Sequence, residues 1–167
     1  TDNENYKLTG DTVVIGGGNV AIDVSRSAVR CDSPKVYQVS LETRDIMPAL
    51  PEEIELAESE GIEFHGGWGP KEILTENGKV TGIVFKKCTQ VKNAEGRFDP
   101  QYDENDTMTI PCSNVLLSVG QGTVWGDLLK DEAVEFRGPA PVADPVTYQT
   151  TVDDIFVGGD MFTGPRF

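Results

Sequence analysis

The sequence has little positive charge and no long hydrophobic run. It contains 14 Lys and Arg residues against 28 Asp and Glu, which gives a formal net charge of −14. A surface of this sign repels phosphate backbones and anionic lipids, so we expect neither a nucleic acid nor a membrane as partner. No apolar run approaches the roughly 18 residues needed to cross a bilayer, and no N-terminal hydrophobic region indicates export.

Cysteine and histidine are scarce as well. The three cysteines, Cys31, Cys88 and Cys112, are isolated and odd in number, which excludes a disulfide framework and suits a reducing, cytoplasmic compartment. The absence of a C-x-x-C pair excludes both a dithiol redox centre and a cysteine metal site. His65 is the sole histidine, so we expect it to be structural and expect no metal.

At 167 residues, the chain has room for one good core, or for one domain and part of another. It begins with Thr1 rather than methionine, and we expect it to be an excised piece of a longer protein.

The most informative segment is a glycine turn between an expected strand and an expected helix. Residues 12–15 predict a buried strand, and residues 19–30 predict a helix. Gly16 permits a sharp turn, and Gly18 carries no Cβ that would hold the backbone away from a phosphate. Ala21 stands where the third glycine of a G-x-G-x-x-G motif would be, and it still allows close packing of helix on strand.

Such a turn seats a dinucleotide pyrophosphate. The first N–H groups of a helix have no intrahelical acceptor, and the helix dipole is positive at this end. The expected pyrophosphate contacts are backbone groups of this turn and of the first helical residues, namely Gly16, Gly17, Gly18, Asn19 and Val20.

The first half of the chain alternates strand and helix, which predicts parallel strands. The inward face of the first helix is expected to carry Val20, Val24 and Ala28. The further elements are a strand over 35–41, a helix over 51–60 that buries Ile54 and Ala57 and stops at Gly61, and a strand over 62–64.

After residue 70 the pattern becomes antiparallel. Asn77-Gly78 predicts a tight hairpin between strands 73–76 and 80–87, with Ile83 and Phe85 on one face. Residues 93–106 are polar and acidic and are expected to form a solvated loop rather than a calcium site. The expected elements beyond it are strands 107–110 and 114–119, the latter ending at Gly120, a loop or linker at 138–141, and a final strand over 155–160.

Several landmarks together resemble the pyridine-nucleotide-binding domain of two-dinucleotide-domain flavoproteins, of the glutamate synthase small-subunit type. They are Val14-Ile-Gly-Gly-Gly-Asn-Val-Ala-Ile-Asp23, Met47-Pro48-Ala49, Leu116-Leu-Ser-Val-Gly-Gln121 and Thr150-Thr-Val-Asp-Asp-Ile-Phe-Val-Gly-Gly-Asp160. The resemblance implies an α/β, Rossmann-like three-layer domain with a parallel sheet and an antiparallel β-meander, inserted in a mostly missing FAD-binding domain.

The resemblance also implies the domain boundaries and further sites. Residues 1–121 would be the NAD(P)H-binding domain, and residues 122–167 would return to the truncated FAD domain. Gly159 and Asp160 would then face FAD, with Asp160 on the ribityl chain, and Gly120 and Gln121 would lie near the nicotinamide half of NAD(P)H.

At the end of the second strand, relatives that use NADPH usually carry paired arginines, whereas this chain has Leu41-Glu42. A carboxylate there accepts hydrogen bonds from the ribose hydroxyls and repels a 2′-phosphate, which predicts NADH over NADPH. Arg44, two residues on, can turn toward a phosphate and is therefore also a candidate cofactor-binding residue.

The implied function is hydride transfer from NADH to FAD and onward to an iron–sulfur or other partner subunit. The cofactors carry such chemistry and the protein positions them, so no catalytic side chain is expected and this piece alone should be inactive. Two alternatives remain open at this point: a Rossmann-like scaffold domain that has lost its ligand, and an S-adenosylmethionine-dependent methyltransferase, which also uses a glycine turn and an acid after the second strand.

Overall fold

The computed structural model describes residues 6–120 and 122–164. The chain divides into two compact units, residues 1–120 and 121–167. The glycine turn and the antiparallel strands belong to the first unit, and the Gly-Gly-Asp segment belongs to the second.

The first unit is built on a four-stranded parallel sheet. Its order is β3-β2-β1-β7, with β1 Thr12–Ile15, β2 Val36–Ser40, β3 Glu63–Gly66 and β7 Asn114–Leu117. In the register of the sheet, Thr12 lies opposite Val36 on one side and Asn114 on the other. The predicted parallel arrangement of the first three strands is therefore confirmed.

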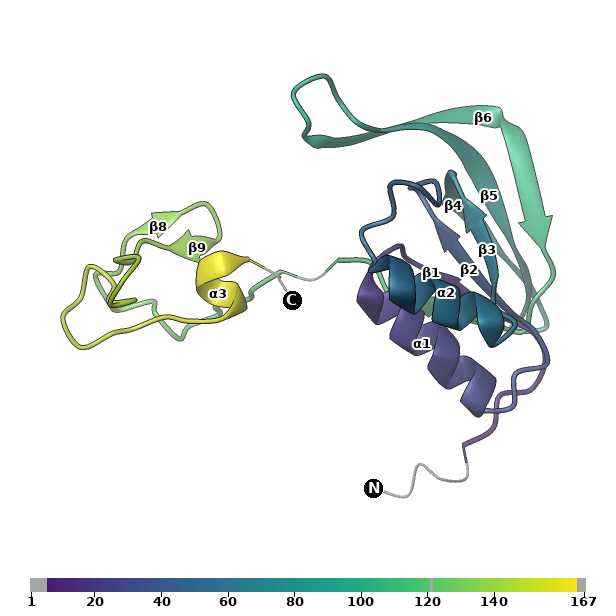
Figure 1. Ribbon diagram of the computed structural model, residues 1–167, viewed down its shortest axis with the longest axis horizontal. Helices are drawn as coiled ribbons and strands as arrows, with labels where there is room; N and C mark the ends of the chain where they lie inside the picture. Colours follow the sequence, from purple (N-terminus) through teal and green to yellow (C-terminus); the bar gives the residue numbers. More distant parts are fainter. Residues whose placement is uncertain (1–5, 121, 165–167) are drawn as a thin grey trace. The chain divides into compact units, whose positions relative to one another are not determined.

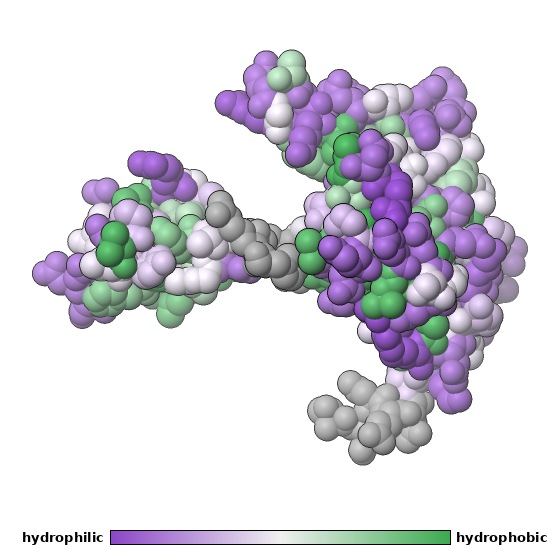
Figure 2. Space-filling view, in the orientation of Figure 1, coloured by the Kyte–Doolittle hydropathy of each residue, from purple (hydrophilic) through white to green (hydrophobic). Residues whose placement is uncertain are grey.

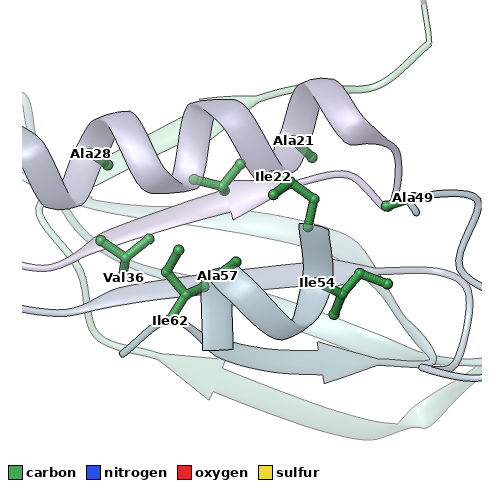
Figure 3. Close-up of a cluster of buried hydrophobic side chains, with 9 residues drawn as sticks. Ala21, Ile22, Ala28, Val36, Ala49, Ile54, Ala57 and Ile62 are labelled. Carbon is green, nitrogen blue, oxygen red and sulfur yellow. The ribbon is translucent and has the colours of Figure 1, made fainter. Parts of the chain in front are cut away.

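Two helices cover one face of this sheet, α1 Asn19–Arg30 and α2 Pro51–Ser59 (Figure 1). The core between helices and sheet consists of small and branched side chains, which include Ala21, Ile22, Val36, Ile54 and Ala57 (Figure 3). Close packing of such side chains is what allows a helix to approach a sheet closely. The predicted burial of Ile54 and Ala57 is confirmed.

An antiparallel sheet covers the opposite face. Its order is β4-β5-β6, with β4 Trp68–Glu76, β5 Lys79–Lys92 and β6 Phe98–Ile110. Ile83 and Phe85 of β5 are fully buried in a second core with Val13, Ile15 and Val39 of the parallel sheet. Since β1 sends Val14 to the helices and Val13 and Ile15 to this second core, the fold has three layers, as the sequence predicts.

The hairpin between β4 and β5 turns at Asn77-Gly78, as predicted. Both residues have positive φ, 50° and 74°, which is the backbone of a type I′ turn. The first strand of this hairpin begins at Trp68, earlier than the sequence suggests, and it contains a register shift at Pro70.

The predicted inward face of α1 is partly wrong. Ala28 is buried, but Val24 is only partly buried and Val20 is 58% exposed, whereas Ala21 and Ser25 are fully buried. The helix packs through Ile22 together with Ala21, Ser25 and Ala28, and three of these four are small residues that carry little hydrophobic signal beside the valines.

The predicted loop over residues 93–106 is wrong. β5 runs to Lys92 and β6 starts at Phe98, so only a short turn remains, closed by Asn93 Oδ1, which accepts the backbone N–H groups of Glu95 and Arg97. The acidic residues of β6 are exposed, and Glu104 pairs with Lys86 of β5 at 2.6 Å. The acidic residues of this segment therefore indicate that the strand is exposed to solvent, and they do not indicate a loop.

The second unit contains little regular structure. Its elements are β8 Phe136–Arg137, β9 Ala140–Pro141 and the short helix α3 Asp160–Thr163. Residues 138–141 are therefore a hairpin turn and its second strand rather than a linker. The predicted strand over 155–160 is also wrong: Phe156 forms only an isolated bridge with Gln149, and without a continuous partner strand no ladder forms.

None of the helices within residues 6–120 and 122–164 has the length and the apolar character needed to cross a membrane.

Candidate nucleotide-binding site

A cavity of about 440 Å³ lies at the carboxyl ends of β1 and β2, within the first unit. Three groups of residues line it: the glycine turn, the residues that end β2, and aromatic residues of the antiparallel sheet. They include Gly16, Gly17, Gly18, Ser40, Leu41, Glu42, Pro48, Trp68, Phe98, Tyr102 and Gly120. The carboxyl ends of parallel strands are where open α/β sheets bind ligands.

Gly16 makes the turn possible. Its φ is +151°, and a Cβ at this position would lie 2.3 Å from the Ser118 carbonyl oxygen and 3.0 Å from the Ala21 Cβ. Its N–H donates to the Val39 carbonyl oxygen at 2.9 Å. The turn therefore packs tightly between two strands and the helix, as the small residue at Ala21 predicts.

Gly18 faces open space instead. A Cβ built on it would have no heavy atom within 4 Å, and its φ of −93° is open to any residue. It is the N-cap of α1, no side chain caps the helix, and the first turn carries no acidic residue. The free N–H groups of Asn19 and Val20 and the positive end of the helix are thus available to an anion.

The side chain of Asn19 fixes the turn to the following loop. Asn19 Oδ1 accepts the Leu50 N–H at 2.8 Å, and the Gly17 carbonyl oxygen accepts the Ala49 N–H at 3.1 Å. These two hydrogen bonds hold the segment Met47-Pro48-Ala49 against the glycine turn. This contact uses only the side-chain oxygen of Asn19, so its backbone N–H and its Nδ2 remain as donors for a ligand.

Gln38 was not predicted as a site residue, but its side chain holds the glycine turn in place through a hydrogen bond. It is 1% exposed in the middle of β2, its Nε2 donates to the Gly16 carbonyl oxygen at 3.1 Å, and its Oε1 accepts the Ser25 hydroxyl at 2.9 Å. The one sequence feature that could have indicated Gln38 is its place as a polar residue in a strand predicted to be buried. A buried polar side chain is nearly always hydrogen-bonded.

Glu42 stands beside the glycine turn. Its Oε2 lies 2.8 Å from the position that a Cβ on Gly17 would occupy. Its backbone oxygen accepts the Ser40 hydroxyl at 2.8 Å and the Gly67 N–H at 3.2 Å, so the backbone that carries the carboxylate is held on two sides. Among residues 6–120 and 122–164, no ion pair engages this carboxylate.

Arg44 does not line the cavity. Its guanidinium makes two hydrogen bonds to the Glu58 carboxylate of α2, at 3.0 and 3.2 Å. This contact raises the pKa of Arg44 further above its ordinary value. A phosphate would have to compete with Glu58 for the guanidinium.

The remaining candidate residues fall in three places. Gly120 lines the cavity, and Gln121 lies outside the described residues. Gly159 and Asp160 belong to the second unit, where Gly159 has φ +58° and precedes α3 and Asp160 is exposed.

The aromatic wall of the cavity was not predicted from the sequence. Trp68 of β4 and Phe98 and Tyr102 of β6 line it together with the glycine turn. Burial raises the pKa of the Tyr102 hydroxyl, so this group is neutral and can donate a hydrogen bond. The spacing of these residues along the chain gives no hint that they meet, because the pairing of β4, β5 and β6 brings them together.

Within the described part of the chain, no cluster of three or more His, Cys, Asp and Glu residues is arranged to hold a metal ion. The cavity instead offers free helix N–H groups, a carboxylate without an ion pair and flat apolar side chains. The helix N–H groups and the carboxylate fit a pyrophosphate joined to a ribose, which needs an anion site and an acceptor for the ribose diol.

Comparison with known proteins places this geometry in a family. The family model described as pyridine nucleotide-disulphide oxidoreductase matches residues 1–167. The beta subunit of the NADP(+)-dependent formate dehydrogenase of Moorella thermoacetica is 35% identical over 157 residues, which are 92% of this chain and 22% of that protein. The small chain of the NADPH glutamate synthase of Halomonas elongata is 30% identical over 171 residues, covering 98% of this chain and 36% of that protein.

Solved structures confirm the fold. The thioredoxin reductase of T. acidophilum has a TM-score of 0.75 at 20% identity, over 93% of this chain and 45% of that one. FprA of Mycobacterium tuberculosis, solved in complex with NADPH, has a TM-score of 0.65 at 18% identity, over 94% of this chain and 48% of that one. The chain thus spans less than half the length of each of these four proteins.

Proposed function

The chain belongs to the pyridine nucleotide-disulphide oxidoreductase family, whose members are FAD- and NAD(P)-dependent oxidoreductases, and on that premise we propose that its first unit binds NADH for hydride transfer to FAD. The observation that carries this proposal is the pairing of an open glycine at a helix N-terminus with a carboxylate that no ion pair within the described residues engages. Gly18 leaves room for phosphate oxygens, and Glu42 stands next to Gly17. This pairing suits a pyrophosphate joined to a ribose diol.

In this proposal, the residues of the chain bind and orient the cofactor. The N–H groups at Gly17, Gly18, Asn19 and Val20 bind the pyrophosphate, Glu42 accepts hydrogen bonds from the adenosine ribose, and Gly120 leaves room for the nicotinamide half. Bound nicotinamide would supply the hydride. Because hydride transfer depends chiefly on position, we assign no side chain a catalytic role.

The preference for NADH rests on Glu42. Its charge would repel a 2′-phosphate, and the nearest arginine in sequence, Arg44, is held by Glu58. Several relatives carry NADP(+) or NADPH in their names, so the preference of this chain would depart from theirs.

The other assignments are proposals on the same footing. Residues 1–121 would form the NAD(P)H domain and 122–167 a return into an FAD domain, with Gly159 and Asp160 facing FAD and Gln121 near the nicotinamide. Electrons would pass on to an iron–sulfur or other redox subunit of a cytoplasmic protein, and this chain alone would bind NADH without turning it over.

Calorimetric titration of the full chain with NADH and with NADPH tests the proposal. We expect NADH to bind at least tenfold more tightly, a difference of about 1.4 kcal/mol, and Glu42→Arg to reverse the order. Glu76→Arg is the matched control: it makes the same charge change on an exposed residue of β4 outside the cavity, and it should leave the order unchanged.

Two results would contradict the proposal. Tighter binding of NADPH by the wild type, or no effect of Glu42→Arg, would refute the role of Glu42. Binding of neither nucleotide would favour the scaffold alternative instead. The methyltransferase alternative is already removed, because the family match covers residues 1–167.

A further inference from the structure

The cavity has a second wall that the proposed function does not use. Trp68, Pro70, Phe98 and Tyr102 form it, and all of them come from β4 and β6 of the antiparallel sheet. Phe98 is 66% exposed although it follows a polar turn in a very acidic strand. Phe98 belongs to neither buried cluster, and it lines the cavity beside the glycine turn instead.

The far part of the β5–β6 hairpin, residues 86–103, is here called the ribbon. In Figure 1 the ribbon extends beyond the rest of the first unit, above the loop that joins β2 to α2. Val91 and Lys92 line a second hollow together with Glu42, Ile46 and Pro48, so the ribbon borders that loop closely. The space-filling view shows a mostly hydrophilic far end of the ribbon (Figure 2), which sets its aromatic residues apart from their neighbours.

The aromatic rings are held in place by their neighbours. A Cβ on Gly69 would lie 2.5 Å from Tyr102 Cε1, so the ring packs directly on the glycine backbone of β4. Lys86 Nζ lies 4.2 Å from the centre of the Tyr102 ring, and Lys87 Nζ lies 4.6 Å from the centre of the Trp68 ring. Cations over aromatic rings restrict both partners, which leaves a preformed aromatic surface.

The spatial order of the site matches the chemical order of adenosine diphosphate. Glu42 Oε2 approaches Gly17 of the phosphate-binding turn on one side. On the other side the Glu42 carbonyl oxygen accepts the Gly67 N–H, which brings Trp68 beside Glu42. A ligand with its pyrophosphate at the turn and its ribose at Glu42 therefore meets the aromatic wall with the group that follows the ribose.

We propose that Trp68, Phe98 and Tyr102 form the purine subsite of this chain, so that β4 and the ribbon together bind the adenine base while the glycine turn binds the phosphates and Glu42 binds the ribose. The inference rests on the proposed function, because it assumes a dinucleotide at the glycine turn. Adenine is flat and apolar on its faces, and stacking on aromatic side chains is the usual way to hold such a base.

Two small probes divide the dinucleotide at its pyrophosphate. AMP carries the base, and nicotinamide mononucleotide carries the other half. We expect the full chain to bind AMP and ADP-ribose, and Phe98→Ala to weaken both, together with NADH, by about tenfold. Nicotinamide mononucleotide should bind equally to the wild type and to Phe98→Ala, and Phe98→Tyr, which keeps a ring, should retain most of the wild-type affinity.

The emission of Trp68 gives a readout that a structural role would not change. The chain has two tryptophans, so Trp125→Phe leaves Trp68 as the only one. AMP should quench its emission with the same dissociation constant that calorimetry gives. Phe156→Ala is the matched control, because Phe156 is 59% exposed in the second unit, and it should leave every affinity unchanged.

The outcomes separate the two proposals. If the wild type binds ADP-ribose and Phe98→Ala binds it equally well with Trp68 unquenched, the purine subsite is refuted while the proposed function stands. If the wild type binds neither ADP-ribose nor NADH, both the proposed function and the purine subsite are refuted. Phe98 is exposed and remote from both cores, so its replacement leaves the fold intact.

Discussion

Gly16 and Gly18 stand in one turn but in opposite surroundings. Gly16 is pressed between the Ser118 carbonyl oxygen and Ala21 at a φ of +151°, whereas Gly18 faces open space at an ordinary φ. The first glycine is therefore required by the fold, whereas the second is required only by the ligand of the proposed function. Because of this contrast, the same substitution, glycine to alanine, tests folding at Gly16 and ligand binding at Gly18.

Gly16→Ala should destabilise the first unit by about 1–3 kcal/mol or more, since its Cβ would overlap a backbone oxygen that cannot move freely. Gly18→Ala should change the free energy of unfolding by less than about 1 kcal/mol, because its Cβ meets no atom. Gly18→Ala should nevertheless weaken NADH binding at least tenfold. Urea unfolding and calorimetry measure the two effects, and a Gly18→Ala variant with wild-type affinity would contradict this division.

Arg26 and Glu60 give the first unit a defined acid sensitivity. Arg26 Nε donates to Glu60 Oε1 at 2.9 Å, and this hydrogen bond holds the pKa of the Glu60 carboxyl below its usual range. A lowered folded-state pKa means that the stabilisation is present above the unfolded-state pKa of about 4.3 and is lost as the pH falls through the folded value.

Glu60→Gln should therefore be less stable than the wild type at pH 7, and the difference should shrink as the pH falls below about 4. Chemical unfolding at pH 7 and at pH 3 measures it. An unchanged difference between the two pH values would show that the charge on Glu60 does not contribute.

At the scale of elements, β2 links the core to the site. Gln38 connects the Ser25 hydroxyl of α1, through a buried hydrogen bond, to the Gly16 carbonyl oxygen, through a partly buried one. Its neighbours in β2, Val36 and Val39, belong to the two different cores. The position of β2 is thus fixed by both cores, and Gln38 in this strand fixes the turn that forms the proposed phosphate site.

Gln38→Leu should cost about 1–3 kcal/mol of unfolding free energy, because it leaves the Gly16 carbonyl oxygen without its side-chain donor and the Ser25 hydroxyl without its acceptor, both in a buried setting. Adding Ser25→Ala should recover part of the loss, since one of these two buried groups is then removed. Gln90→Leu is the control on an exposed position of β5. Equal stability of the two single variants would mean that the buried pair does not matter.

The elements also show what the sequence predicts well. The strand–turn–helix of β1 and α1, the turn at Asn77-Gly78 and the helix α2 follow local rules of periodicity and turn chemistry, and they are found within one or two residues of the expectation. The strands β4 and β5 on either side of that turn are longer than the sequence suggests. The acidic residues of β6 follow no such rule, because its strand pairing is determined by β5 and by ion pairs to Lys86. Local sequence pattern therefore fails to predict a strand when pairing with a strand distant in sequence determines it.

The same distinction holds for the candidate site. Gly16, Gly18 and Glu42 were predictable, because a motif and its distance to the end of the second strand imply them. Gln38 and the aromatic wall were not, since burial and strand pairing bring them to the cavity. Arg44 was named for its place in the sequence, but Glu58 on α2 engages it.

At the scale of the whole molecule, the first unit contains all the residues that line the cavity and both buried clusters. The second unit has short strands, a four-residue helix and many exposed apolar side chains, which include Val124, Leu128, Val146 and Phe156. Binding of the dinucleotide should thus depend on the first unit alone.

A variant that ends at Gly120 should keep the main thermal transition and its increase with NADH. A ligand at 100 times its dissociation constant adds about 2.7 kcal/mol, and both proteins should show it. Scanning calorimetry with and without NADH measures the shift. A truncated variant that folds but has lost the NADH response would mean that residues beyond 120 belong to the site.

In the proposed function, backbone N–H groups of the turn after β1 bind the pyrophosphate of NADH while Glu42 binds its adenosine ribose. A crystal structure of the full chain with NADH measures this directly. The account predicts phosphate oxygens within hydrogen-bonding distance of the Gly18, Asn19 and Val20 N–H groups, and the Glu42 carboxylate on the 2′- and 3′-hydroxyls. NADH bound elsewhere, or a ligand whose ribose points away from Glu42, would contradict it.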